Sequence, residues 1–293
     1  MVRIGLRFSL SWGLGIPATM RFARILLVCA VVAAQAAEAP AERGKRLVNE
    51  ALQALGGDAF THMQDRAESG RVFNFYRSEI TALSLAKIYT QYLPAPAPGN
   101  LGLRERESFL AETLKRPETS AILFREDGAW SITFRGAEPL DSQRYQDFKD
   151  STVRNVFYIL RCRLNEPGWE FDWQSTDVFE NRPVEIVDMT DGAGQTVTVT
   201  FDQDSKLPLR ETYRRRNPQF KDFDTDSTFF ANYHAAGHGV QWPTNIRRER
   251  NGDKIFEMYS DTVEVDKAPA ADLIRSSFQS EASGQAEVGP RLS

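Results

Sequence analysis

The segment VQWPTNIRRERNGDKIFEMYSDTVEV, residues 240–265, decides the fold class because it reads as two strands joined by a tight turn. Asn251-Gly252 is the strongest short signal for a β-hairpin, since a type I′ turn needs a positive φ at both central residues. A two-residue turn sets Arg250 opposite Asp253 and Glu249 opposite Lys254, and these opposite charges favour that register. The sequence therefore predicts a long antiparallel hairpin.

Alternation along this hairpin separates two faces. The same register sets Arg248 opposite Ile255, Arg247 opposite Phe256 and Ile246 opposite Glu257. One face is then apolar apart from Arg248 and Glu257, and its apolar members are Val240, Trp242, Ile246, Ile255, Tyr259 and Val263. The other face carries Gln241, Asn245, Glu249 and Lys254. One core face and one solvated face are typical of an antiparallel sheet.

The rest of the chain holds two helical patterns among about twelve strand-like runs. The first helix is expected over 42–55, where an apolar stripe is followed by Gly56-Gly57. The second is expected over 142–164, with Asp141 or Ser142 as its cap. The other strands are expected over 70–77, 81–93, 104–114, 120–127, 129–136, 169–180, 182–189, 195–202, 207–216 and 227–234.

This order of elements shows no strand-helix alternation and no repeat. It predicts an α+β fold with one large antiparallel sheet. A sheet with so many strands has to curl. We expect an N-terminal helix and a helix over 142–164 that covers the concave, apolar face of the sheet.

The first 36 residues read as a targeting segment. MRFARILLVCAVVAAQA has basic residues, an apolar run and the small-x-small cleavage site Ala34-Gln35-Ala36. We predict a signal peptide over 1–36, of which residues 1–19 are an upstream extension, with cleavage after Ala36 and with Ala37 or Ala39 as alternative cleavage positions. An uncleaved anchor helix is the alternative, although the apolar run is shorter than the roughly 20 residues of a membrane span. A single domain is expected over 37–275 and a disordered tail over 276–293.

Cleavage changes the charge and the cysteine content of the chain. It removes four arginines, so that 32 basic residues face 40 acidic ones, a net charge of −8. This balance argues against nucleic acid as a partner and against a purely electrostatic grip on anionic lipid. Cys162 becomes the one remaining cysteine, which excludes an internal disulfide. Cys29 as a lipoprotein cysteine is an alternative, but Val28 precedes it where a small residue is expected.

The motifs that mark common enzymes are missing from the sequence. His234 and His238 are four residues apart, but glycines make that segment a turn rather than a zinc-binding helix. Asp222, Asp224 and Asp226 alternate, yet the glycine and the glutamate of a calcium loop are missing. No nucleophile elbow, phosphate loop or dinucleotide fingerprint is present. We therefore predict no catalytic residue, no metal site and no cofactor, and a protein that is not an enzyme.

The order of features resembles the LolA/LolB-like superfamily, which includes outer-membrane lipoprotein-sorting proteins of the periplasm. The resemblance rests on a signal peptide, a helix ending in ALQALGG, a meandering sheet and the tract from Trp242-Pro243 to the final strand. It covers roughly residues 42–275. It implies a half-open antiparallel barrel, closed by helices around a hydrophobic cavity for acyl chains, and it carries over no catalytic residue.

The resemblance predicts an exported periplasmic protein that binds a lipid or a lipoprotein acyl chain, with an envelope membrane protein as a further partner, for transport or sorting to the outer membrane. A periplasmic sensor or scaffold of the RseB type, which binds a protein partner without lipid transport, is the alternative. We expect the ligand to be lined by Phe73, Phe75, Leu83, Leu85, Trp130, Ile132, Phe157 and Leu160.

Overall fold

The computed structural model describes residues 38–94, 100–110, 118–217 and 219–267. Contacts within the chain separate residues 1–39 from residues 40–293, and the architecture below is that of the second unit. The predicted signal peptide and the predicted C-terminal tail lie outside the described residues.

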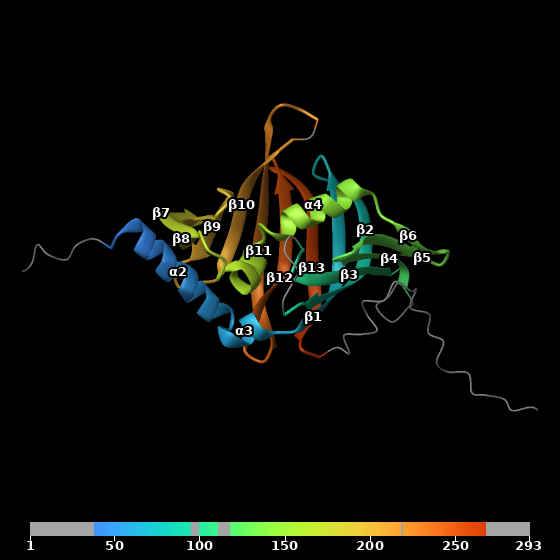
Figure 1. The fold of residues 1–293 in the computed structure, drawn as a ribbon, viewed down its shortest axis with the longest axis horizontal. Coiled ribbons are helices and arrows are strands. Elements are labelled where there is room, and N and C mark those ends of the chain that lie inside the picture. Colours follow the sequence, from blue (N-terminus) through green and yellow to red (C-terminus); the bar gives the residue numbers. More distant parts are fainter. Residues whose placement is uncertain (1–37, 95–99, 111–117, 218, 268–293) are drawn as a thin grey trace, which may run out of the picture. The chain divides into compact units, whose positions relative to one another are not determined.

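The described strands form an antiparallel sheet of thirteen strands in the order β6-β5-β4-β3-β2-β1-β13-β12-β11-β10-β9-β8-β7 (Figure 1). Their bounds are β1 Asp65–Tyr76, β2 Glu79–Tyr92, β3 Leu103–Leu110, β4 Glu118–Arg125, β5 Gly128–Thr133, β6 Gly136–Pro139, β7 Glu170–Phe179, β8 Arg182–Thr190, β9 Thr196–Asp202, β10 Pro208–Arg216, β11 Phe223–Gly237, β12 Val240–Arg250 and β13 Asp253–Val265. The sheet is open, because its first and last strands, β6 and β7, do not pair with each other. The predicted α+β class with a large antiparallel sheet is confirmed.

Helix α2 (Pro40–Leu55) confirms the predicted N-terminal helix. Its stripe of Leu47, Val48, Ala51 and Leu55 is buried, and the helix packs on β7 and β12. The short helix α3 (Asp58–His62) follows, and it buries Phe60. None of the helices in the described ranges combines the length and the apolar character that a membrane span requires.

The predicted continuous helix over 142–164 is interrupted. It consists of α4 (Ser142–Thr152), α5 (Val156–Tyr158) and the π-helical segment η1 (Ile159–Arg163). Asn155 stops the first part because it adopts extended backbone angles, and its side chain accepts hydrogen bonds from the backbone N–H groups of Phe157 and Tyr158. An asparagine is a strong N-cap, so it begins a new helix instead of continuing the old one.

The hairpin of β12 and β13 has the predicted turn but only part of the predicted register. Asn251 and Gly252 both have positive φ angles, and the first two residue pairs are those expected. An irregularity at Ile255 then pairs Arg248 with Phe256 and Ile246 with Met258. One extra residue in a strand reverses the facing of every later side chain. Tyr259 is therefore paired with Asn245 and does not share the face of Ile246 as expected. Ile255 lines the same cavity as Ile246, and a second irregularity, opposite Ser69-Gly70 of β1, returns Val263 to the core that Ile246 contacts, as expected.

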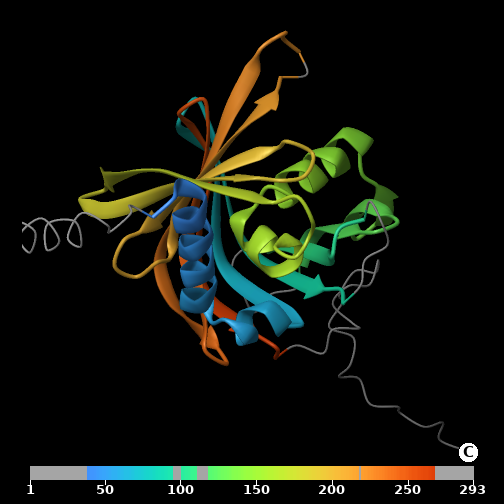
Figure 2. The ribbon, with the colours of Figure 1, turned by 60° about the vertical axis from the view of Figure 1, so that its left-hand side comes forward.

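The main hydrophobic core lies where α2, α3, α5 and η1 meet the strands β8, β9, β11 and β12. Every residue from Val156 to Leu160 is buried, whereas α4 has no buried residue. Figure 2 shows α4 and α5 together across one side of the sheet, apart from α2. The covering helix expected over 142–164 is thus packed at its second part and loosely attached at its first.

Candidate functional site

A cavity of about 910 Å³ lies between α4 and the sheet. Its walls come from α4, α5 and eight strands, β1 to β4 and β10 to β13. A volume of this size is at the upper end of what small-molecule sites use. The concave side of the sheet therefore encloses space that protein side chains do not fill.

The floor of the cavity is apolar where β3, β2, β1 and β13 lie side by side. Val72, Ala86 and Met258 form a buried cluster there, against which Ile88, Phe109 and Phe256 are half-buried. The contributing residues on β1 and β2 have even numbers, because alternate residues of a strand share a face. This floor can hold hydrocarbon.

Charged side chains line the inner wall beside this floor. Arg66 is 8% exposed and Glu68 is 3% exposed. The Arg66 guanidinium lies 3.7 Å from the Glu68 carboxylate and 3.9 Å from that of Glu105, donates to Thr90 Oγ1 at 3.0 Å and stacks over the Trp242 ring at 4.1 Å. Burial raises the pKa of Glu68, although the nearby Arg66 opposes this effect. This inner charge cluster is largely neutralised within itself.

Two further carboxyl groups in the lining have strongly shifted pKa values. Burial raises the pKa of Glu211 to about 7, and burial together with the nearby Glu105 raises that of Glu107 to about 7. Glu211 accepts a hydrogen bond from the Val156 backbone N–H at 2.6 Å and one from the Asn155 side chain at 3.3 Å. Glu211 therefore fixes the junction between α4 and α5 to the sheet.

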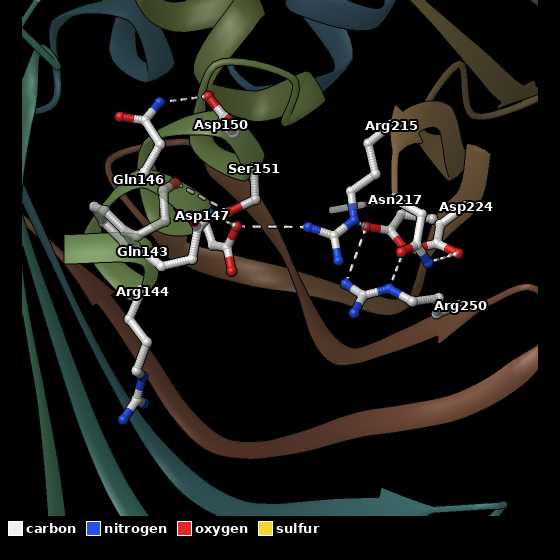
Figure 3. Close-up of polar contacts among 12 residues, drawn as sticks. Gln143, Arg144, Gln146, Asp147, Asp150, Ser151, Arg215, Asn217, Asp224 and Arg250 are labelled. Carbon is white, nitrogen blue, oxygen red and sulfur yellow. Dashed lines mark hydrogen bonds and ion pairs between the residues drawn. The ribbon is translucent and has the colours of Figure 1, made fainter. Parts of the chain in front are cut away.

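Few contacts attach α4 itself to the sheet. Phe148 stacks on Phe124 with ring centroids 3.8 Å apart, and the Asp147 carboxylate lies 3.6 Å from Arg215. Arg215 also pairs with Asp226 of β11 at 3.1 Å (Figure 3). Figure 3 shows the Arg144 side chain extending from α4 in the direction of the strands. The helix covers the cavity without filling it.

The structure places one predicted ligand residue, Phe157, in the cavity lining. Leu160 is 1% exposed inside the main core. Six others are absent from the lining. Phe73, Phe75, Leu83 and Leu85 have odd numbers and point to the opposite face of β1 and β2, while Trp130 and Ile132 belong to a separate cluster with Tyr89, Ala121 and Leu123.

The prediction chose the more apolar face of β1 and β2, but the cavity lies on the other face. Alternation identifies two faces and does not say which one is concave. Arg66 and Glu68, which lie on the concave face of β1, precede the strand expected over 70–77. On β2, the alternate residues Ala86, Ile88, Thr90 and Tyr92 are all uncharged, whereas Lys87 and Gln91 lie on the other face. This uncharged face is the sequence signal that could have indicated the cavity side.

No family model matches the chain, and no curated protein matches it. Solved structures do share its fold. An outer membrane lipoprotein-sorting protein domain from Vibrio parahaemolyticus aligns with a TM-score of 0.52 at 11% identity, covering 79% of this chain and 96% of that one. A DUF1329 family protein from Desulfovibrio piger aligns with a TM-score of 0.54 at 13% identity, covering 81% of this chain and 98% of that one.

Identities this low establish shared architecture and not shared activity. In this chain the architecture is an antiparallel sheet that stays open, with helices across its concave side. The chain therefore has the LolA/LolB-like fold, a half-open β-barrel with a helix across its cavity.

Proposed function

We propose that this protein is an exported periplasmic carrier, which binds a lipid or the acyl chain of a lipoprotein in the cavity under α4 for transport or sorting to the outer membrane. The observation that carries the proposal is a cavity of about 910 Å³ with an apolar floor around Val72, Ala86 and Met258. Burying an acyl chain contributes about 0.8 kcal/mol per CH₂, so binding needs no covalent step.

The polar lining fits the other end of an amphiphile. Arg66, Glu68 and Glu105 are already engaged with one another, and Glu211 holds the backbone of α5. These groups serve as fixed dipoles around a headgroup rather than as free acids and bases for catalysis. The fold shared with the lipoprotein-sorting domain from Vibrio supports this proposal.

Filling the cavity tests the proposal directly. The variant Ile88→Trp places a large side chain in the lining, and Leu85→Trp makes the same change on the opposite face of the same strand. We expect native mass spectrometry of the wild type and of Leu85→Trp to show a bound lipid that is lost from Ile88→Trp. A wild-type protein that neither co-purifies with lipid nor takes up a fluorescent fatty acid would contradict the proposal.

The alternative function, a sensor or scaffold for a protein partner, has one observation in its favour. Strand β7 forms one edge of the sheet; its backbone lies against α2 at Phe171 and Trp173, and residues 174–178 beyond that contact are exposed. An exposed edge can accept a strand from another protein. The same mass spectra distinguish the two functions, since a stoichiometric protein partner without lipid would support the scaffold.

A further inference from the structure

We propose that the end of the sheet at which the cavity opens docks on an anionic lipid bilayer, through neighbouring hairpin turns that expose apolar and basic side chains. The proposal rests on the proposed function, because it states where a carrier of hydrophobic ligands would exchange them. It does not follow from the net charge of the chain, which is negative.

Three hairpin turns lie at the same end of the sheet. The strands β2-β1-β13-β12-β11-β10 are consecutive neighbours, and their antiparallel order brings together Arg77-Ser78, Asn217 with residues 219–222, and Asn251-Gly252. We call these three the mouth turns. Figure 1 shows the β1–β2 turn and the β10–β11 hairpin projecting at the same end, and Figure 2 agrees.

The cavity opens at this end. Its lining residues at the opposite end, such as Tyr92, Phe157 and Trp242, are buried. The lining residues next to the mouth turns, Arg216 and Phe223 among them, are exposed. A ligand therefore enters or leaves past the mouth turns.

Large apolar side chains are exposed at the mouth turns. Phe220 is 68% and Phe223 is 51% exposed on the β10–β11 side, and Tyr76 and Ile80 are 65% and 60% exposed around the β1–β2 turn. Aromatic side chains at such positions are favoured at the interface between water and lipid. Two separate turns thus present apolar groups in the same direction as the cavity opening.

Three of the four exposed charges around the β10–β11 turn are basic. Arg214, Arg216 and Lys221 are exposed, and none of them has an ion pair with a carboxylate of the described residues. Of the acidic residues of the same hairpin, Asp222 is exposed, whereas Asp224 and Asp226 are engaged internally. Asp222 accepts from the Phe223 backbone N–H, Asp224 accepts from Asn217 and Asn251, and Asp226 pairs with Arg215 and Arg250.

Basic side chains beside exposed aromatic groups match a bilayer that contains anionic lipid, because the apolar groups insert while the cations remain at the headgroups. This arrangement places the cavity opening against the membrane. A hydrophobic ligand would then pass between bilayer and cavity with little exposure to water.

Vesicle flotation of the mature protein tests the proposal. The vesicles contain phosphatidylcholine alone or phosphatidylcholine with phosphatidylglycerol. We expect the wild type to bind the anionic vesicles and to lose binding as salt is added. The double variant Phe220→Ser/Phe223→Ser should bind at least about tenfold more weakly, because two large apolar side chains no longer insert.

Matched controls lie far from the mouth turns. Val178→Ser alters a residue on β7 that is as exposed as Phe220, and Lys45→Glu changes a charge on α2 for comparison with Lys221→Glu. We expect Lys221→Glu to weaken binding and both controls to leave it unchanged. Equal binding by the double variant and by Val178→Ser, or equal binding to neutral and anionic vesicles, would overturn the proposal.

Two further outcomes separate this inference from the proposed function. If the wild type does not bind vesicles but binds an envelope protein through Phe220 and Phe223, the surface is a protein-binding site and the bilayer proposal is wrong. If lipid still co-purifies with a protein that binds no vesicle, docking fails while the carrier function stands.

Discussion

The concave side of this sheet has a packed region and an open region, and the two differ mainly in the helix that covers each. Under α5 and η1, Phe157 lies 4.6 Å from Trp242 and 4.8 Å from Phe230, ring to ring, and Val156 and Ile159 are fully buried. Under α4 the sheet faces about 910 Å³ of space. The sequence VFYIL fills its side of the sheet, whereas SQRYQDFKDST has few side chains that can.

This difference separates stability from binding. Close-packed side chains supply most of the free energy of folding, and a cavity lining supplies less because it forfeits contacts. A binding site needs the reverse, unfilled apolar space next to a stable support. Because the helix breaks at Asn155, α5 and η1 pack against the sheet and stabilise the fold, while α4 covers the unfilled cavity.

The largest expected effect comes from the packed region. Leu160→Ala should lower the free energy of unfolding by about 2–5 kcal/mol, because it removes buried methyl groups and leaves a new void. Ile88→Ala in the open region should cost about 1 kcal/mol or less, since its neighbourhood is already partly empty. Urea denaturation of both variants measures the contrast, and similar losses in the two would show that the regions do not differ in this way.

The second effect is a pH dependence that originates at the boundary between the regions. The pKa of Glu211 is raised from 4.5 to about 7 in the folded protein, so the folded state binds a proton that the unfolded state releases. Stability should therefore fall as pH rises from about 4.5 to 7, by up to about 3 kcal/mol for this group. Glu107 and Glu68 contribute in the same direction.

Glu211→Gln should reduce that fall, because glutamine is neutral at every pH and still accepts the hydrogen bond from Val156. Thermal unfolding between pH 5 and pH 8 measures the slope. Glu264→Gln removes an exposed carboxylate near the end of β13 and serves as the control. If stability falls equally with pH in both variants, Glu211 is not the source of the pH dependence.

The smallest effect on stability should come from α4. Phe148→Ala removes the stack on Phe124, an interaction worth about 0.5–1.5 kcal/mol, and should lower the free energy of unfolding by about 1 kcal/mol. Hydrogen exchange of the amides in residues 142–152 should also become faster, because this helix has few other contacts. Phe134→Ala, at a position that is 77% exposed, is the control. Unchanged exchange in Phe148→Ala would mean that other contacts hold the helix.

The sequence was sufficient for the fold because its strongest signals are local. Asn251-Gly252 located a type I′ turn, and the stripe on residues 47–55 located α2. The turns at Arg77-Ser78 and Glu180-Asn181 also have positive φ angles at both residues, yet without glycine they gave no comparable signal. Sequence patterns therefore predict a turn reliably where the residue type favours the required backbone angle, and less reliably where it does not.

The cavity lining could not be predicted in the same way. Which side chains face the cavity depends on which side of the sheet is concave and on the irregularity at Ile255. Both are set by the pairing of strands, which the local sequence does not specify. Arg66 and Glu68 are buried on the concave face, although charges ordinarily indicate a solvated face. They are tolerated because Glu105, Thr90 and Trp242 compensate them, and these partners lie on other strands.

The neighbours at the middle of the sheet have a consequence for how the chain folds. Strands β1 and β13 pair side by side, with Arg66 opposite Val265, although almost the whole domain separates them in sequence. Closing so long a loop lowers the conformational entropy of the chain before stabilising contacts form, which makes this pairing a slow, late step in folding. Strands β1 to β6 can meander together before the later strands pair, but the cavity floor is complete only when the last strand, β13, is in place.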